Sequence, residues 1–208
     1  RNTSGMLIES RTLMIVCTVF RYLPVTGCYY KANLLHKSEK VMKNKLNSMR
    51  LLEQHQIPYE VIEFSDELRD AEVIAEVVGL PPFMVYKTLV VEPERAGAKP
   101  FLVMIAADRR LDLKKLASVA GEKKVRMASH RDAEAMTGLK VGGISALALT
   151  HKHWTVFLDQ PAMTLQNIVI SGGQRGVDLR VPTQALIGLL RPRLAGISLP
   201  LDDDVSSS

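Results

Sequence analysis

Residues 85–91 read Val-Tyr-Lys-Thr-Leu-Val-Val, and residues 100–106 read Pro-Phe-Leu-Val-Met-Ile-Ala. Both runs are dominated by β-branched, aromatic and other apolar residues, which favour extended backbone. The segment between them carries charges and a glycine, so the two runs predict a β-hairpin.

Helices and strands alternate irregularly on both sides of this hairpin. Apolar residues at helical spacing predict helices over residues 42–56, 70–78, 112–120, 130–136 and 182–190. Runs of β-forming residues predict further strands over residues 59–64, 124–127, 154–158, 167–171 and 177–181. This order indicates an α+β fold with a mixed, largely antiparallel or barrel-like sheet flanked by helices, rather than a doubly wound parallel sheet.

The chain divides into three regions. Residues 42–199 are expected to form one domain, residues 1–41 an N-terminal extension outside the core, and residues 200–208 a flexible acidic and serine-rich tail. The apolar runs of residues 1–41 are shorter than a membrane-spanning helix and do not form a signal peptide. An amphipathic membrane anchor is the alternative for that segment, but no stable membrane association is expected.

The formal net charge of +5 in 208 residues is concentrated near the start of the chain. Residues 1–41 hold six Lys and Arg against Glu9 and Glu39, so the later residues are close to neutral overall. A global charge argument for nucleic-acid binding therefore fails. The best local basic run covers residues 109–126, where it forms either a solvated helix face or a phosphate-binding patch. Its first cations are Arg109, Arg110, Lys114 and Lys115.

Both cysteines, Cys17 and Cys28, lie in the N-terminal segment. The predicted domain therefore has neither a disulfide framework nor a thiolate zinc site. This composition is consistent with a reducing cytoplasm, which is the expected location.

Lys87 is the most informative single residue. Strand alternation places it on the same face as Val85, Leu89 and Val91. A lysine on an apolar strand face is either a strand-edge charge that reaches out to water, or a fixed cation that binds a carbonyl, phosphate or carboxylate.

Two glycine-bearing turns are candidates for close contact with a ligand. They are Val-Gly-Gly-Ile-Ser at residues 141–145 and Ile-Ser-Gly-Gly-Gln-Arg-Gly-Val-Asp at residues 170–178. Their amides either form an anion-binding nest or simply make turns. Asp178 either orients Lys87 or Ser171, or caps backbone amides.

Other catalytic signatures are absent from the sequence. It contains no phosphate-binding GxxxxGK[ST] loop, no nucleophile elbow and no HExxH zinc motif. His151 and His153 would share a face if they lay on a strand, but a pair without a third ligand is more often structural than metal-binding.

Together, a set of short motifs resembles the YbaK/EbsC family, which includes the insertion domain of bacterial prolyl-tRNA synthetase. The motifs occur in order through nearly all of residues 42–199. They are Gly79-Leu-Pro, Val85-Tyr-Lys-Thr-Leu-Val90, Leu111-Asp-Leu-Lys-Lys-Leu116, Thr137-Gly138, Val141-Gly-Gly-Ile-Ser145 and Ser171-Gly-Gly-Gln-Arg-Gly-Val-Asp178.

The resemblance implies a trans-editing aminoacyl-tRNA deacylase that hydrolyses the ester of mischarged tRNA, of the Cys-tRNA(Pro) or Ala-tRNA(Pro) type. The lysine of its KTL motif implies a catalytic role for Lys87. The implied substrate-binding residues are Thr88, Gly142, Gly143, Ser145, Ser171 and Asp178. No metal and no cofactor are implied. The implied partner is the 3′ aminoacyl-adenosine end of mischarged tRNA, with prolyl-tRNA synthetase as a further candidate and the cations from Arg109 to Lys115 as candidate tRNA contacts.

Some positions depart from the family pattern. Ala146 and Ala148 stand where proline and glycine are common, and Phe64 stands where an aromatic hydroxyl is usual. The altered loop leaves the amino acid open and allows a second interpretation, a non-catalytic module that binds aminoacyl-tRNA or a synthetase. A small-molecule hydrolase or binding protein with a lysine in its pocket is a third.

Overall fold

The computed structural model describes residues 45–201. The predictions for residues 1–41, and for residues 202–208 of the tail, lie outside this range. Within it, no helix is both long enough and apolar enough to cross a membrane.

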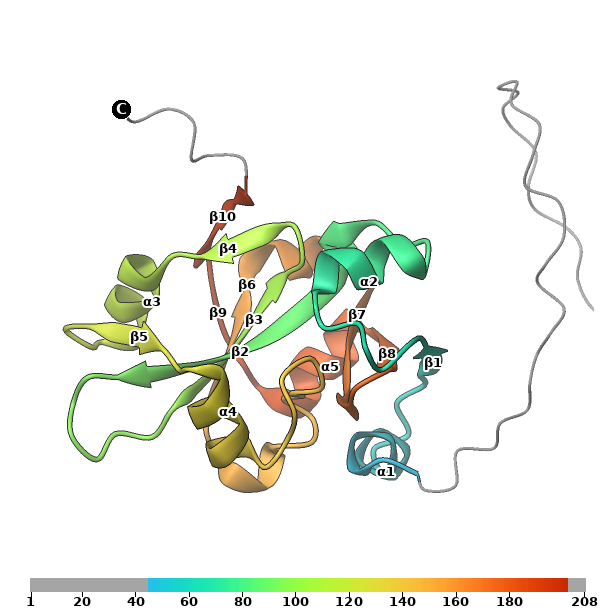
Figure 1. The fold of residues 1–208 in the computed structure, drawn as a ribbon, viewed down its shortest axis with the longest axis horizontal. Coiled ribbons are helices and arrows are strands. Elements are labelled where there is room, and N and C mark those ends of the chain that lie inside the picture. Colours follow the sequence, from blue (N-terminus) through green and yellow to red (C-terminus); the bar gives the residue numbers. More distant parts are fainter. Residues whose placement is uncertain (1–44, 202–208) are drawn as a thin grey trace, which may run out of the picture. The chain divides into compact units, whose positions relative to one another are not determined.

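A large mixed sheet forms the centre of the fold (Figure 1). It contains β1 (Glu60–Glu63), β2 (Val85–Pro93), β3 (Phe101–Ala106), β5 (Val125–Met127), β6 (Thr155–Asp159), β7 (Asn167–Gln174), β8 (Val177–Pro182) and β9 (Arg193–Ala195). Its strand order is β1-β8-β7-β2-β3-β6-β9, and β5 pairs with β2. A separate two-stranded sheet joins β4 (Arg109–Leu111) to β10 (Ser198–Pro200).

The pairing pattern confirms the predicted α+β class and the mixed sheet. The hairpin of β2 and β3 is antiparallel, as predicted, with Lys87 opposite Ile105. β2 pairs with β7, β3 with β6, and β6 with β9 in parallel. The other ladders are antiparallel.

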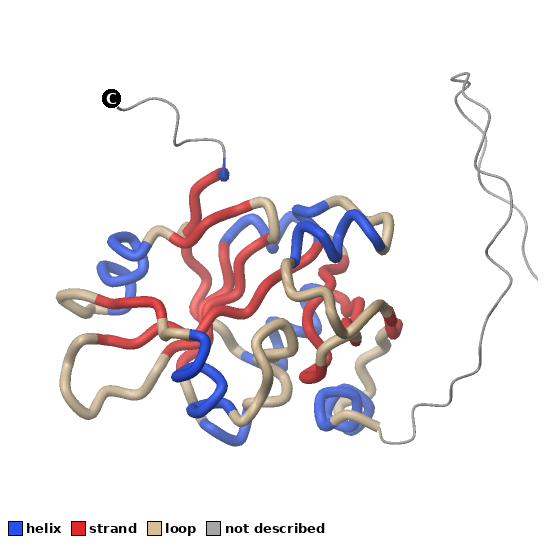
Figure 2. Tube along the Cα trace, in the orientation of Figure 1, coloured by secondary structure: helices blue, strands red, loops and turns tan. Residues whose placement is uncertain are grey.

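Short helices flank the sheet (Figure 2). The α-helices are α1 (Asn47–Gln54), α2 (Ala71–Val77), α3 (Leu113–Ala120), α4 (His130–Thr137) and α5 (Thr183–Leu190). Asp70, Asp112 and Ser129 cap α2, α3 and α4 by accepting hydrogen bonds from first-turn amides. Gly121 and Gly138 end α3 and α4 in the left-handed conformation. These capping residues explain why the predicted helix boundaries are close to the observed ones.

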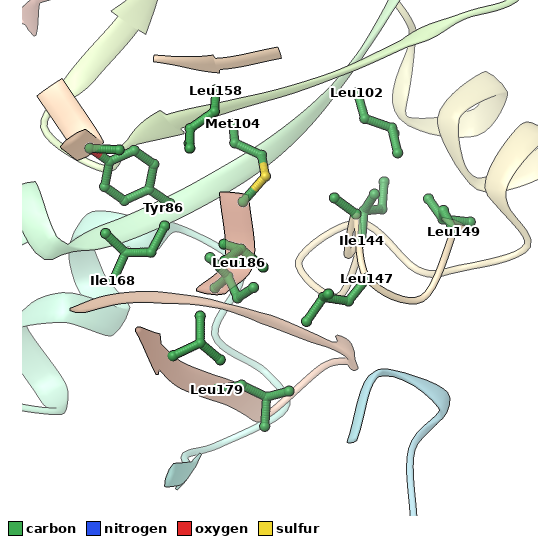
Figure 3. Close-up of a cluster of buried hydrophobic side chains, with 14 of the residues drawn as sticks. Tyr86, Leu102, Met104, Ile144, Leu147, Leu149, Leu158, Ile168, Leu179 and Leu186 are labelled. Atoms are coloured by element: carbon green, nitrogen blue, oxygen red, sulfur yellow. The ribbon is translucent and has the colours of Figure 1, made fainter. Parts of the chain in front are cut away.

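Strand alternation separates the core into clusters on the two faces of the sheet. The largest cluster packs against α5 and the loop that follows α4 (Figure 3). It includes Tyr86, Met104, Leu147, Leu158, Ile168 and Leu186. On the other face, α3 covers Val91, Ile105 and Phe157, and α2 covers Val85 and Val169. Residue 87 therefore lies on the face covered by α2 and α3, as the alternation predicted.

Some local details differ from the expectation. The condition under which His151 and His153 would share a strand face is not met, because η2 (Thr150–Lys152) is a 3₁₀ turn and His153 has left-handed backbone. The glycine-rich turn at residues 170–178 is shorter than expected, since β7 continues to Gln174 through a register shift. β4, β9 and β10 are three-residue strands that no pattern indicated.

Candidate active site

A cleft of about 710 Å³ opens where the sheet splits beside β2. On this edge, β7 pairs with β2 only at Val85 and Tyr86, and β5 joins only from Val91. The ladder between β2 and β7 ends at Ile170, just before the register shift between Ser171 and Gln174 in the pairing of β7 with β8. The cleft is bounded by this split in the sheet, α2, α4 and the loop that follows α4.

Three polar side chains stand in a row across the sheet at this point. Val85 pairs with Val169, so Lys87 and Ser171 lie one step beyond the end of the β2–β7 ladder on the same face. Ser171 in turn pairs directly with Asp178 of β8. Lys87, Ser171 and Asp178 all line the cleft.

The Lys87 amine is held inside the cleft by the backbone. Its Nζ donates a hydrogen bond to the carbonyl oxygen of Ala107 at 2.9 Å. Partial burial lowers the pKa of Lys87 below its ordinary value, while Glu72, Asp70 and Asp108 oppose that shift. A half-buried cation with donors to spare is suited to binding an oxyanion or a phosphate.

Asp178 has a buried carboxylate without a hydrogen-bond or ion-pair partner among the described residues. The residue is 5% exposed, and no hydrogen bond or ion pair reaches the carboxylate from residues 45–201. Desolvation raises the pKa of Asp178 from 3.8 to about 7. A cationic ligand group in the cleft would offset this desolvation.

The Asp178→Asn variant is expected to be more thermally stable than the wild type at pH 8 by several degrees, and equally stable near pH 4. With its raised pKa, folded Asp178 keeps a proton that the unfolded chain has lost, so stability falls as pH rises from about 4 to 7. Asparagine has no such charge. Melting curves of both proteins from pH 4 to 8 test this, and a constant difference across the range would contradict it.

The two glycine turns dock against each other. A Cβ on Gly143 would lie 2.7 Å from the backbone nitrogen of Arg175, and one on Gly173 would lie 2.9 Å from Cβ of Ala148. Arg175 Nε donates to the carbonyl oxygen of Val141 at 2.7 Å, and its Nη2 lies 3.6 Å from Oε1 of Glu134. Close backbone contact and a two-partner arginine therefore hold the loop of residues 141–145 against the β7–β8 turn.

The structure brings together most of the predicted site residues. Lys87, Thr88, Gly142, Ser171 and Asp178 line one cleft. Two others do not line it. Gly143 packs on the β7–β8 turn, and Ser145 is fully buried with an unpartnered Oγ among residues 45–201.

The predicted basic run lies outside the cleft lining. Arg109 Nε donates to Ser198 Oγ and lies 3.5 Å from Oδ2 of buried Asp159, so it has a structural role at the β4–β10 sheet. Lys115 pairs with Asp112 on its own helix at 3.8 Å. Lys114 extends from the same helix, and Arg110 belongs to β4.

Several charged residues of the cleft were missed from the sequence. Arg69, His130, Arg131, Glu134 and Arg175 all line it. Arg175 could have been found, because it belongs to the Ser171–Asp178 motif. Arg69 and Arg131 lie in no motif, and only the fold brings them to this place.

Comparison with known proteins identifies the family. Residues 65–189 match the model of the aminoacyl-tRNA editing domain. The chain is 35% identical over 163 residues to EbsC of Enterococcus faecalis, named as a candidate Cys-tRNA(Pro)/Cys-tRNA(Cys) deacylase; the match covers 77% of this chain and 98% of that protein.

The chain belongs to the aminoacyl-tRNA editing family. The YbaK/EbsC resemblance is thereby confirmed. The editing domain is also 24% identical over 155 residues to a proline–tRNA ligase of Geobacter metallireducens, covering 74% of this chain but only 25% of that enzyme.

Solved structures share the fold of this editing domain. A candidate trans-editing enzyme for prolyl-tRNA synthetase matches with a TM-score of 0.62 and 23% identity, covering 74% of this chain and 95% of that one. A hypothetical protein matches with a TM-score of 0.67 and 20% identity, covering 74% and 99%. At these identities the likeness establishes the fold alone.

Proposed function

We propose that this protein is a trans-editing deacylase that hydrolyses the aminoacyl ester of mischarged tRNA, of the Cys-tRNA(Pro) or Ala-tRNA(Pro) type. The observation that carries the proposal is the row of Lys87, Ser171 and Asp178 in one cleft. This row offers a cation for the 3′-terminal nucleotide and a carboxylate for the α-ammonium group of the amino acid. The relatives named for Cys-tRNA deacylation and proline–tRNA ligation support the substrate class.

The proposed reaction is ester hydrolysis. A water oxygen adds to the ester carbonyl carbon, and the carbonyl oxygen becomes a tetrahedral oxyanion. The bond between this carbon and the ribose oxygen then breaks as the carbonyl re-forms. One proton of the water passes to the ribose oxygen, and the other leaves with the acid group. The products are the free amino acid and tRNA with its terminal hydroxyl restored.

This reaction needs few catalytic side chains. An aminoacyl ester is already activated, so positioning and oxyanion stabilisation supply most of the required acceleration. The apolar lining contributed by Ala71, Ile74 and Ile144 leaves room for a small side chain. We expect the side chain of cysteine or alanine to contact this lining.

A deacylation assay tests the proposal. Purified protein is mixed with tRNA(Pro) charged with cysteine, alanine or serine, and release of the amino acid is followed against spontaneous hydrolysis. Faster release of cysteine or alanine is expected. Tight binding of all three without release would instead support the non-catalytic module, and neither release nor binding would refute an editing role.

The tRNA is expected to contact cations at the cleft. Arg69 and Arg131 line the cleft and form no ion pair with residues 45–201. The Arg69→Gln/Arg131→Gln double variant should raise the Kd for tRNA about tenfold and flatten its log–log salt dependence by roughly 0.7 for each lost phosphate contact.

The matched control carries Lys114→Gln and Lys115→Gln, which remove the same charge from exposed positions on α3. Filter binding from 50 to 300 mM salt compares the two variants. A larger loss in the α3 variant would place the tRNA on the basic run and not at the cleft.

A further inference from the structure

The register of the central hairpin determines which way each β2 amide points. The N–H of Ala107 donates to the carbonyl oxygen of Val85 at 2.7 Å, so residue 85 directs its backbone polar groups toward β3. Because these groups alternate along a strand, residues 87 and 89 also point toward β3, and residues 86, 88 and 90 point toward the opposite edge. The N–H of Ala128 confirms this direction by donating to the carbonyl oxygen of Val90 from the β5 side at 3.0 Å.

On the edge of β2 that faces away from β3, the backbone N–H and C=O of Thr88 have no hydrogen-bond partner in the described sheet. The β7 ladder ends at Tyr86, and the contact with residue 128 begins at Val90. No ladder or loop hydrogen bond within the described chain reaches the N–H or C=O of residue 88. Thr88 lines the cleft, as do its neighbours Lys87 and Leu89. An unpaired strand edge of this kind is a template for adding another extended segment.

We infer that the main chain of Thr88 binds the aminoacyl group of the substrate in the way that it would bind one residue of a neighbouring β-strand. This inference rests on the proposed deacylase function and specifies how its site holds the reacting ester. An aminoacyl ester carries a carbonyl acceptor and an α-ammonium donor on adjacent carbons, which is the donor and acceptor pattern of one residue in a β-ladder. The N–H of Thr88 donates to the ester carbonyl oxygen, and its C=O accepts from the α-ammonium group.

This arrangement gives Thr88 a part in the chemistry. As water adds to the ester carbon, negative charge develops on the oxygen that the N–H of Thr88 contacts, so this hydrogen bond strengthens in the transition state. Asp178 of β8, which also lines the cleft, supplies the charge that balances the α-ammonium group. Lys87 remains available for the adenosine end, because the N–H of Thr88 takes the ester carbonyl oxygen and Asp178 takes the α-ammonium group.

The same geometry reduces the role of the glycine loop. Gly143 packs against the β7–β8 turn, and Ser145 is fully buried. Of the loop residues 142–145, only Gly142 and Ile144 line the cleft. The strand edge is therefore the better-placed source of an oxyanion donor.

A backbone substitution tests the inference without changing a side chain. The Thr88→Ala protein is compared with the same protein carrying lactic acid in place of that alanine, which replaces the N–H of residue 88 with an ester oxygen. Since this N–H points away from β3, the hairpin ladder is kept. The expected result is a fall in the deacylation rate of about 10²-fold relative to Thr88→Ala, because one oxyanion donor is lost.

The control is the same replacement of alanine by lactic acid at Ala96, an exposed residue of the turn between β2 and β3, which should leave the rate unchanged. A second arm compares alanyl-tRNA with propionyl-tRNA, each normalised to its spontaneous hydrolysis. The ester at residue 88 should lower kcat for both substrates, whereas loss of the α-amine should raise KM.

The outcomes separate this inference from the proposed function. If Thr88→Ala deacylates and its lactic acid counterpart is equally fast, the inference is overturned and the deacylase function stands. If the wild-type chain releases no amino acid from any charged tRNA, the deacylase function itself fails.

Discussion

The Lys87→Ala variant is expected to lower the deacylation rate by about 10²-fold while leaving the protein folded, because the adenosine end that carries the ester loses the cation that positions it. The amine is held at the cleft by its hydrogen bond to Ala107, on the same face as Ser171 and Asp178. Removing it takes away the one cation of that row. The fold should persist, because burial disfavours the charged amine and its lowered pKa reports that cost.

Single-turnover deacylation and thermal melting measure the two effects separately. Lys99→Ala is the matched control, since Lys99 is an exposed lysine in the turn of the same hairpin. Its rate should equal that of the wild type. Wild-type deacylation by Lys87→Ala protein would exclude the amine from the reaction.

Gly143→Ala should lower both the melting temperature and the activity. The added Cβ would lie 2.7 Å from the nitrogen of Arg175 and 2.8 Å from the carbonyl carbon of Gln174, and both are backbone atoms that cannot rotate away. Overpacking of this kind costs about 1–3 kcal/mol of unfolding free energy. Separation of the two turns should also shift Ser171 and Gly142, and displacement by about 1 Å can cost 10²-fold in rate.

Gly188→Ala provides the comparison for this variant. Gly188 lies inside α5, and a Cβ there would meet nothing within 4 Å. Alanine in place of a helical glycine should stabilise the protein by roughly 0.5–1 kcal/mol. If Gly143→Ala melts at the wild-type temperature, the tight contact between the turns is not what holds the loop.

The elements of the fold were predictable wherever the signal is local. Asp112 and Gly121 mark the ends of α3, and the alternation around Lys87 identifies both its strand and its face. Three-residue strands such as β4 and β10 carry too short a pattern to detect, and their pairing depends on the buried Asp159, which binds Ser198 and the N–H of Ile197.

The candidate site was predictable only as far as its motifs reach. The motifs bring Lys87, Ser171 and Asp178 to attention, but not their order across the sheet, which depends on a parallel pairing between residues 85 and 169. Ser145 follows Gly142 closely in the same motif, yet the loop turns it into the interior. Arg69 and Arg131 carry no sequence signal, because a cation becomes part of a site only through its neighbours in space.

The parallel pairing of β2 with β7 should limit how fast the candidate site forms during folding. Strands β2 and β7 meet only after more than eighty intervening residues have been organised, which is a slow kind of contact to form during refolding. In a partly folded species that has formed only the hairpin, Lys87 would be in its strand, but Ser171 and Asp178 would not yet lie beside it. Recovery of deacylation after dilution from denaturant should therefore lag behind recovery of secondary structure. The delay would report the rate at which β2 pairs with β7.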